Sequence, residues 1–171
     1  MKLNLRNITA LKVLAAFCSI ALVGGLLTDC RAQELRFNSG GGPLTLQVQS
    51  ATAGSEPQDA TDASTEIYWD ANFGAASKLT VSTIAPGQSF NLYLLLSVPS
   101  QGGGGQGVVQ PEVMLVDGML DADLLTDIPS TLPGRQGFGT LNYRAATTVA
   151  DGNSSMHGDD VHIVTLTFLA Q

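Results

Sequence analysis

Oxygen-bearing side chains gather in one loop near the end of the chain. Asp151, Asn153, Asp159 and Asp160 fall within ten residues, between two β-prone runs. Calcium takes about six to eight oxygen ligands of this kind from flexible loops. The spacing does not match an EF-hand loop, and Asx and Gly residues also form ordinary turns. The loop is therefore interpreted either as a calcium site or as a plain turn.

Three aromatic residues form a second candidate site. Tyr68, Trp69 and Phe73 lie within six residues of one another, and Trp69 is the only tryptophan. Exposed aromatic faces beside Asp and Asn can stack on sugar rings, while the polar neighbours bind hydroxyl groups. A lone tryptophan on a strand of a sandwich instead fills the core between the sheets. Glycan platform, partner interface and core filling all remain open at this point.

The residue types needed for catalysis are sparse. A nucleophile needs a neighbouring base and a group that orients the base, and no Gly-x-Ser-x-Gly motif is present. The histidines are His157 and His162, too few for a zinc site. His162 opens a strand, where we expect an exposed or hydrogen-bonded side chain. A glycosidase-type pair of catalytic carboxylates remains an alternative, because its two members would come from strands far apart in the sequence. We expect a protein that is not an enzyme.

Apolar and polar residues alternate along much of the chain, which is typical of half-buried strands. The pattern places Leu92, Leu94 and Leu96 on one face of a central strand, and Leu141, Tyr143 and Ala145 on another. The expected strands span residues 44–49, 66–69, 78–84, 90–98, 112–116, 140–146 and 161–170.

Turn-forming residues separate these runs. They include Pro86-Gly87, the glycine-rich loop Gln101–Gly107, Gly137 and Asp151-Gly152, and Asp121–Thr126 is at most one helical turn. About seven strands with almost no helix predict an all-β fold, an antiparallel immunoglobulin-like β-sandwich. A β-barrel is the alternative.

The N-terminal 32 residues have the layout of a secretory signal peptide. Basic residues precede the uncharged apolar run Val13–Leu27, and Cys30-Arg31-Ala32 offers small residues at a cleavage site. The run is shorter than the roughly 20 residues needed to cross a bilayer. We expect cleavage after Ala32. Lipidation at Cys30 and an uncleaved anchor are the alternatives.

The expected mature chain begins at Gln33, with residues 33–43 as a flexible leader and residues 44–171 as a single β-sandwich domain. It contains no cysteine, so the fold must be stable without disulfides. It retains four basic and fourteen acidic residues, a net charge of −10. Binding to nucleic acid needs clustered Lys and Arg, so nucleic acid is excluded as a partner.

Three segments carry a resemblance to known proteins. Residues Gly158–Gln171, Leu115–Met119 and Thr126–Ser130 resemble small exported β-sandwich proteins of Gram-negative bacteria without assigned activity. A fainter likeness is to cohesin-like modules, which also end on a hydrophobic strand after a Gly/Asp loop. The resemblance implies an exported sandwich and supplies no catalytic residues.

Together these patterns predict an exported, non-enzymatic interaction or structural protein, such as a component of a surface, matrix or appendage. Its location would be secreted, periplasmic or at the cell surface, without a membrane span after cleavage. Self-association or a protein partner would use exposed strand edges, which offer unpaired hydrogen-bonding groups. The alternative function is a glycan-binding module. Calcium is the one cofactor considered.

Overall fold

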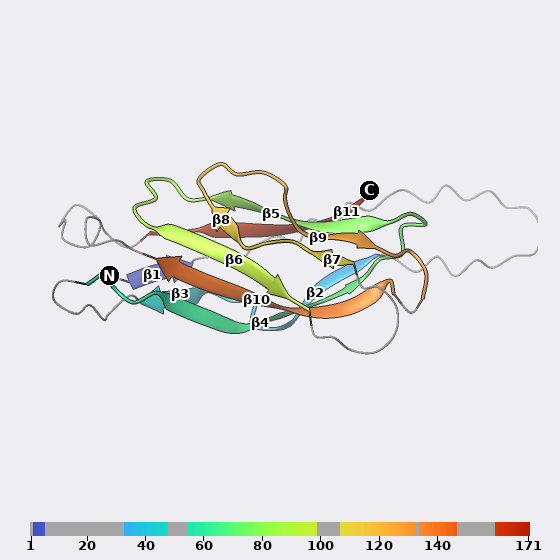
Figure 1. Ribbon diagram of the computed structural model, residues 1–171, viewed down its shortest axis with the longest axis horizontal. Coiled ribbons are helices and arrows are strands. Elements are labelled where there is room, and N and C mark those ends of the chain that lie inside the picture. The colour runs from blue at the N-terminus through green and yellow to red at the C-terminus, as the bar shows by residue number, and fades with distance from the viewer. Residues whose placement is uncertain (1, 6–32, 48–54, 99–106, 133, 147–159) are drawn as a thin grey trace, which may run out of the picture.

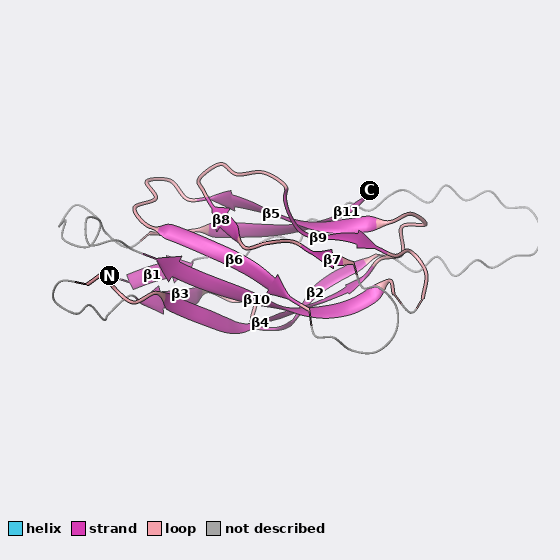
Figure 2. Cartoon of the chain, in the orientation of Figure 1, coloured by secondary structure: helices cyan, strands magenta, loops and turns pink. Residues whose placement is uncertain are grey.

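The computed structural model describes residues 2–5, 33–47, 55–98, 107–132, 134–146 and 160–171, and these residues contain strands and no helix (Figures 1 and 2). Accordingly, this part of the chain has no helix that could span a membrane. The strands are β1 (Lys2–Leu5), β2 (Glu34–Ser39), β3 (Leu44–Gln47), β4 (Ala60–Asp70), β5 (Ser77–Ile84), β6 (Asn91–Ser97), β7 (Val108–Val109), β8 (Val113–Leu115), β9 (Ala122–Ile128), β10 (Gln136–Ala146) and β11 (Ile163–Ala170).

Two antiparallel sheets form the body of the protein. One has five strands in the order β2-β4-β10-β6-β8, and the other has four in the order β11-β5-β9-β7. Strands β1 and β3 form a separate antiparallel pair. Figure 1 shows the two sheets as stacked layers rather than as one closed cylinder. The predicted all-β sandwich is confirmed, and the barrel alternative is wrong.

The core lies between the two sheets and is built by the alternation seen in the sequence. Leu92, Leu94 and Leu96 of β6 are buried, and so are Leu141 and Tyr143 of β10. Burying a side chain of this size contributes about 1.5–3 kcal/mol relative to leaving it in water. These strand faces therefore provide the main stabilisation of a fold that has no cysteine in its sandwich.

Strand β9 differs from the expectation for this region. Residues 121–126 were expected to form at most a helical turn, yet most of them belong to β9. Two bulges interrupt its pairing with β5, and each of them places one extra residue of β9 opposite β5. Because of these bulges, the consecutive residues Leu124 and Leu125 are both buried, which simple alternation does not allow.

Strand β2 also differs from the expectation. Glu34–Ser39 were assigned to a flexible leader, but they pair with β4 and form one edge of the five-stranded sheet. Leu35 lies in the core, and Phe37 packs against it. An edge strand of this kind gives a weak signal in the sequence, because only two of its six side chains face the core.

Trp69 and two glycines set the packing between β4 and β10, near one end of these two strands. Trp69 is 1% exposed and lies directly opposite Gly137 of β10. A Cβ atom at Gly137 would overlap the indole, and one at Gly139 would lie 2.6 Å from Leu96 Cδ1 and 3.3 Å from the indole. Gly137, which was interpreted as a turn residue, is therefore a strand residue whose missing side chain makes room for the indole.

We predict that Gly137→Ala destabilises the fold by about 1–3 kcal/mol, the usual cost of overpacking a core. Gly42→Ala is the matched control, because a Cβ there meets nothing within 4 Å. The measurement is the free energy of unfolding in urea for both variants. Equal stabilities of the two variants would contradict the close contact between Trp69 and β10.

Candidate functional site

The structure separates the three aromatic residues of the expected platform. Trp69 points into the core. Tyr68 is the next residue on the same strand, so its side chain lies on the opposite, outer face of the sheet. Phe73 packs edge-on against Phe168, with ring centroids 5.0 Å apart. The three rings do not share one surface, so Tyr68, Trp69 and Phe73 do not form the predicted glycan platform.

Tyr68 instead belongs to a row of side chains on the outer face of the five-stranded sheet. The register pairs Arg36 of β2 with Tyr68 of β4, and Tyr68 with Phe138 of β10. The Arg36 guanidinium lies 4.5 Å from the Tyr68 ring centroid, and the Tyr68 and Phe138 rings are 5.2 Å apart. We call Arg36, Tyr68 and Phe138 the aromatic row.

Phe138 is the exposed aromatic residue of the row, and the sequence analysis missed it. It is 46% exposed although it lies on the central strand β10, near the start of that strand. The available signal was Gly137-Phe138-Gly139, in which two residues without side chains flank a large aromatic residue. Within a strand, this pattern places the glycines on one face and the phenylalanine alone on the other.

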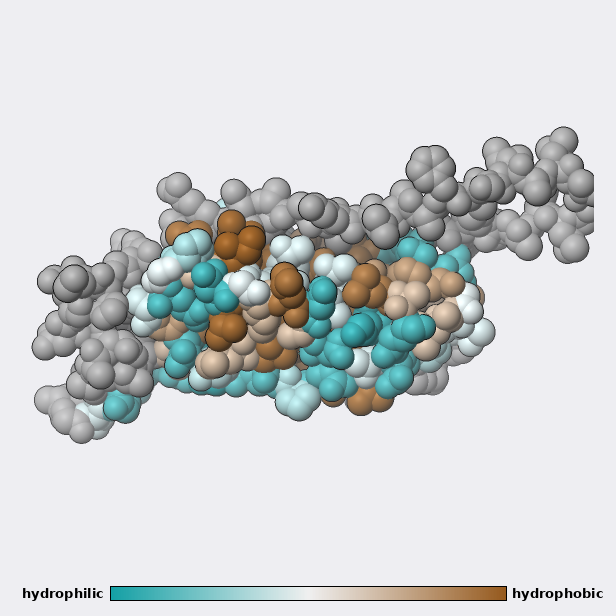
Figure 3. Space-filling model, turned by 90° about the horizontal axis from the view of Figure 1, so that it is seen from above, coloured by the Kyte–Doolittle hydropathy of each residue, from teal (hydrophilic) through white to brown (hydrophobic). Residues whose placement is uncertain are grey.

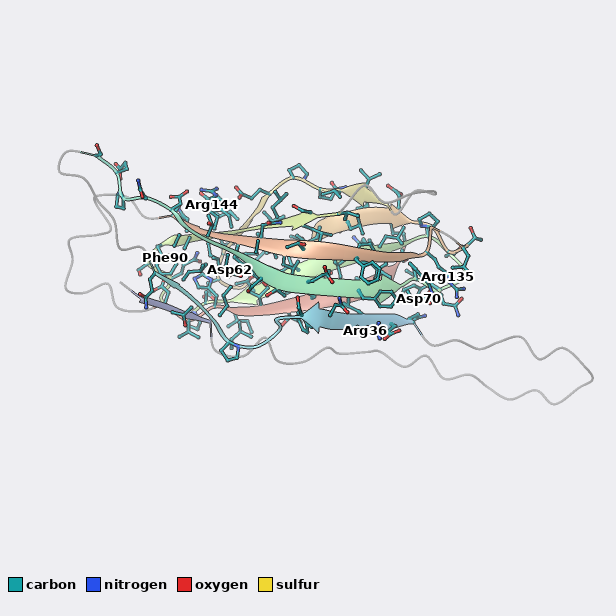
Figure 4. All side chains as sticks on the ribbon, turned by 90° about the horizontal axis from the view of Figure 1, so that it is seen from below. Arg36, Asp62, Asp70, Phe90, Arg135 and Arg144 are labelled. Atoms are coloured by element: carbon teal, nitrogen blue, oxygen red, sulfur yellow. The ribbon has the colours of Figure 1, made fainter. Side chains whose placement is uncertain are left out.

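Polar groups lie on both sides of the aromatic row. On one side, Asp70 forms an ion pair with Arg135 (Nε to Oδ1, 2.9 Å) and accepts a hydrogen bond from Gln136 Nε2 at 2.7 Å. On the other side, the amide of Asn38 donates to Glu66. Figure 4 shows Arg36, Asp70 and Arg135 toward one end of the sheet. Carboxylate and amide groups thus frame the two rings.

Tyr93 is a second aromatic residue on the outer face of the five-stranded sheet, and its ring is covered by Arg144. The Arg144 guanidinium lies 4.0 Å from the Tyr93 ring centroid. It also binds Asp59 at 2.7 Å and makes two hydrogen bonds to Glu112. These carboxylates raise the pKa of Arg144 above its ordinary value. Arg144 lies at the opposite end of the sheet from Arg135 (Figure 4).

The expected calcium ligands are only partly within the described residues. Asp151, Asn153 and Asp159 lie outside them, whereas Asp160 is described. The Asp160 carboxylate is buried and accepts hydrogen bonds from the Ser89 amide, the Ser89 hydroxyl and the Phe90 amide at 2.7, 2.7 and 3.2 Å. Asp160 therefore holds the turn before β6. No group of three or more metal-ligating side chains occurs among the described residues.

His162 is fully buried, in contrast to the exposed or hydrogen-bonded side chain expected. Its Nε2 lies 4.0 Å from Asp160 Oδ2, and its ring centroid is 5.7 Å from that of Phe90. Neither ring nitrogen has a hydrogen-bond partner within the described part of the chain. Burial lowers the pKa of His162 below 6.5, although Asp160 and Asp117 oppose this shift.

Strand edges form the last candidate site. β3 pairs with β1 along four residues, from Lys2 opposite Gln47 to Leu5 opposite Leu44. β11 is an edge of the four-stranded sheet and pairs with β5 in unbroken register over eight residues. On the surface seen in Figure 3, apolar residues lie in separate groups between hydrophilic ones. This surface therefore presents no single large apolar patch.

Comparison of the chain with protein-family models, with curated proteins and with solved structures gives no significant match.

We predict that Asp160→Ala lowers the free energy of unfolding by about 2–3 kcal/mol, because a buried donor left unpaired costs about 1–3 kcal/mol. The loss should be the same in millimolar calcium and in a chelator, since the carboxylate is occupied by Ser89 and Phe90. Urea unfolding in the two buffers measures it. A loss confined to the calcium buffer would identify Asp160 as a ligand instead.

We predict that stability falls as the pH drops below 6.5. The unfolded chain protonates His162 near pH 6.5, whereas the folded protein keeps the ring neutral to a lower pH. The unfolded state then binds more protons, so acid favours unfolding. Urea midpoints at pH 7.5 and pH 5 test this, with His162→Leu as the control that should reduce the difference. An unchanged midpoint in the wild type would show that the folded pKa is not lowered.

Proposed function

We propose that this chain is an exported, non-enzymatic interaction protein that associates by strand addition at β3. The partner is a second copy of the chain or another protein that offers an extended segment. The main support for this proposal is that β3 pairs with β1, a strand within the segment that we expect to be removed on export. Strand β1 spans Lys2–Leu5, and the expected cleavage follows Ala32.

The support for β3 as an acceptor comes from its attachment to the core. Leu46 of β3 is 4% exposed and belongs to the core cluster, and Leu44 packs against that cluster. These side-chain contacts link β3 to the sandwich core in addition to its main-chain pairing with β1. After cleavage, β3 would remain on the sandwich while its hydrogen-bonding groups on that edge lose their partner. An unpaired edge of this kind is a template for another strand.

The chemistry of the edge also favours association. β3 reads Leu-Thr-Leu-Gln and has neither a charged residue nor a proline, both of which protect edge strands from pairing. Main-chain hydrogen bonds would supply affinity, and the side chains of the incoming strand would supply specificity. This is the mode of recognition known as β-augmentation.

The test uses the mature chain Gln33–Gln171 and a synthetic peptide of residues 1–7. We predict that the mature chain self-associates with concentration in analytical ultracentrifugation, and that the peptide reduces association by occupying β3. A scrambled peptide of the same composition is the control. Peptide binding should also slow amide hydrogen exchange in residues 44–47, because these residues would form hydrogen bonds with the peptide.

Two outcomes would contradict this proposal. One is a mature chain that stays monomeric and does not bind the peptide. The other is association that the peptide and its scrambled control affect equally. N-terminal sequencing of the exported protein tests the cleavage step separately, with Gln33 as the expected first residue.

A further inference from the structure

We propose that the aromatic row is a binding site for neutral polysaccharide, with the exposed Phe138 ring as the stacking surface for sugar rings and with Tyr68, whose ring is covered on one face by Arg36, packed beside it. The site lies on the outer face of the five-stranded sheet and uses no residue of β3. This inference therefore does not rest on strand addition.

The geometry of the aromatic row fits a flat ligand. Its three members come from adjacent strands in direct register, so the row runs across the sheet for about 10 Å, two interstrand spacings. The Tyr68 and Phe138 rings are tilted by 54° to each other and do not stack flat against each other. The Phe138 ring, 46% exposed near the start of β10, offers a flat apolar surface to a ligand. The C–H faces of a pyranose ring complement the electron-rich faces of such rings.

Hydrogen-bonding groups lie where sugar hydroxyls would extend. Glu66 and Asn38 lie on one side of the row and Asp70 and Gln136 on the other. The half-buried Glu66 has more acceptor sites than its bond to Asn38 uses, whereas the buried Asp70 is held by Arg135 and Gln136 and serves to position the Gln136 amide. Burial and the nearby carboxylates of Asp70 and Glu34 raise the pKa of Tyr68, so its hydroxyl stays protonated and can donate.

The charges select a neutral sugar chain over other occupants. The Arg36 guanidinium is paired with Glu34 at 3.0 Å and Arg135 with Asp70 at 2.9 Å, and Glu66 adds a further carboxylate. The two arginines beside the row are thus already paired with carboxylates, so the row offers a polyanion no cluster of basic residues of the kind that binds phosphate. A protein interface centres on apolar residues with few charges, whereas here charged residues adjoin both sides of the rings.

Affinity electrophoresis of the purified protein tests the site. The gels contain hydroxyethylcellulose, xyloglucan, galactomannan or a soluble β-1,3-glucan, and alginate serves as the polyanion. We expect retardation by at least one neutral polysaccharide and none by alginate. Phe138→Ala should weaken that binding at least tenfold, and Tyr68→Ala should weaken it less, because Tyr68 packs against the Phe138 ring and positions it. The partial exposure of both side chains should leave the variants folded, which their melting temperatures check.

Tyr93→Ala is the matched control. Tyr93 is an aromatic residue on the same sheet face, but its ring is covered by Arg144, so its removal should leave binding within about twofold of wild type. The proposal is overturned if no neutral polysaccharide retards the protein, if alginate alone does, or if Phe138→Ala binds like wild type. It is also overturned if Phe138→Ala abolishes self-association instead, because the row would then be a protein contact. The peptide of residues 1–7 should not affect retardation, which separates this site from β3.

Discussion

The packing of the Trp69 indole against the backbone of β10 is the contact on which the five-stranded sheet depends. The indole fills the space that side chains at Gly137 and Gly139 would occupy, so the backbone of β10 lies directly on an aromatic surface. This fixes which residue of β10 lies opposite Trp69, and a slip of one residue would place Phe138 against the indole. Because side chains alternate in a strand, the same register places Tyr68 and Phe138 together on the outer face. The core contact and the aromatic row are therefore two consequences of one alignment.

The sequence predicted the strands whose alternation is regular. β5, β6 and β11 lie close to their expected ranges, because apolar and polar residues alternate along their sequences, and β6 buries every second side chain. Strand β9 was not predicted. β9 contains bulges and a non-glycine residue with positive φ, Asp127 at 54°, so its apolar residues lose the period of two. These irregularities are stabilised by contacts with β5 and with Gln171, whose side chain accepts a hydrogen bond from the Asp127 amide. Such partners are far apart in sequence.

The candidate site was only partly predictable for a related reason. Tyr68 was identified, because a cluster of aromatic residues is visible in the sequence. Arg36 and Phe138 were missed, because only the pairing of β2, β4 and β10 brings residues 36, 68 and 138 into one row. Asp160 was identified as a possible oxygen ligand, but its partners are the amides of Ser89 and Phe90, about seventy residues earlier. Residue types therefore indicate what a side chain can do, and the register decides which groups it meets.

Stability and binding use opposite faces of the same strands, and this limits how the protein can change. A substitution at Phe138 alters the outer surface while the glycines beside it keep the contact with Trp69. A substitution at either glycine moves the backbone of β10 and with it both Phe138 and the pairing to Tyr68. The buried ion pair between Asp70 and Arg135 also links the core to the outer face. Asp70 directly follows the core residue Trp69 in β4, and its side chain lies beside the aromatic row. The surface of this sheet can thus vary at Phe138 and Arg36 with little effect on the core, whereas the position of the row is set by the core itself.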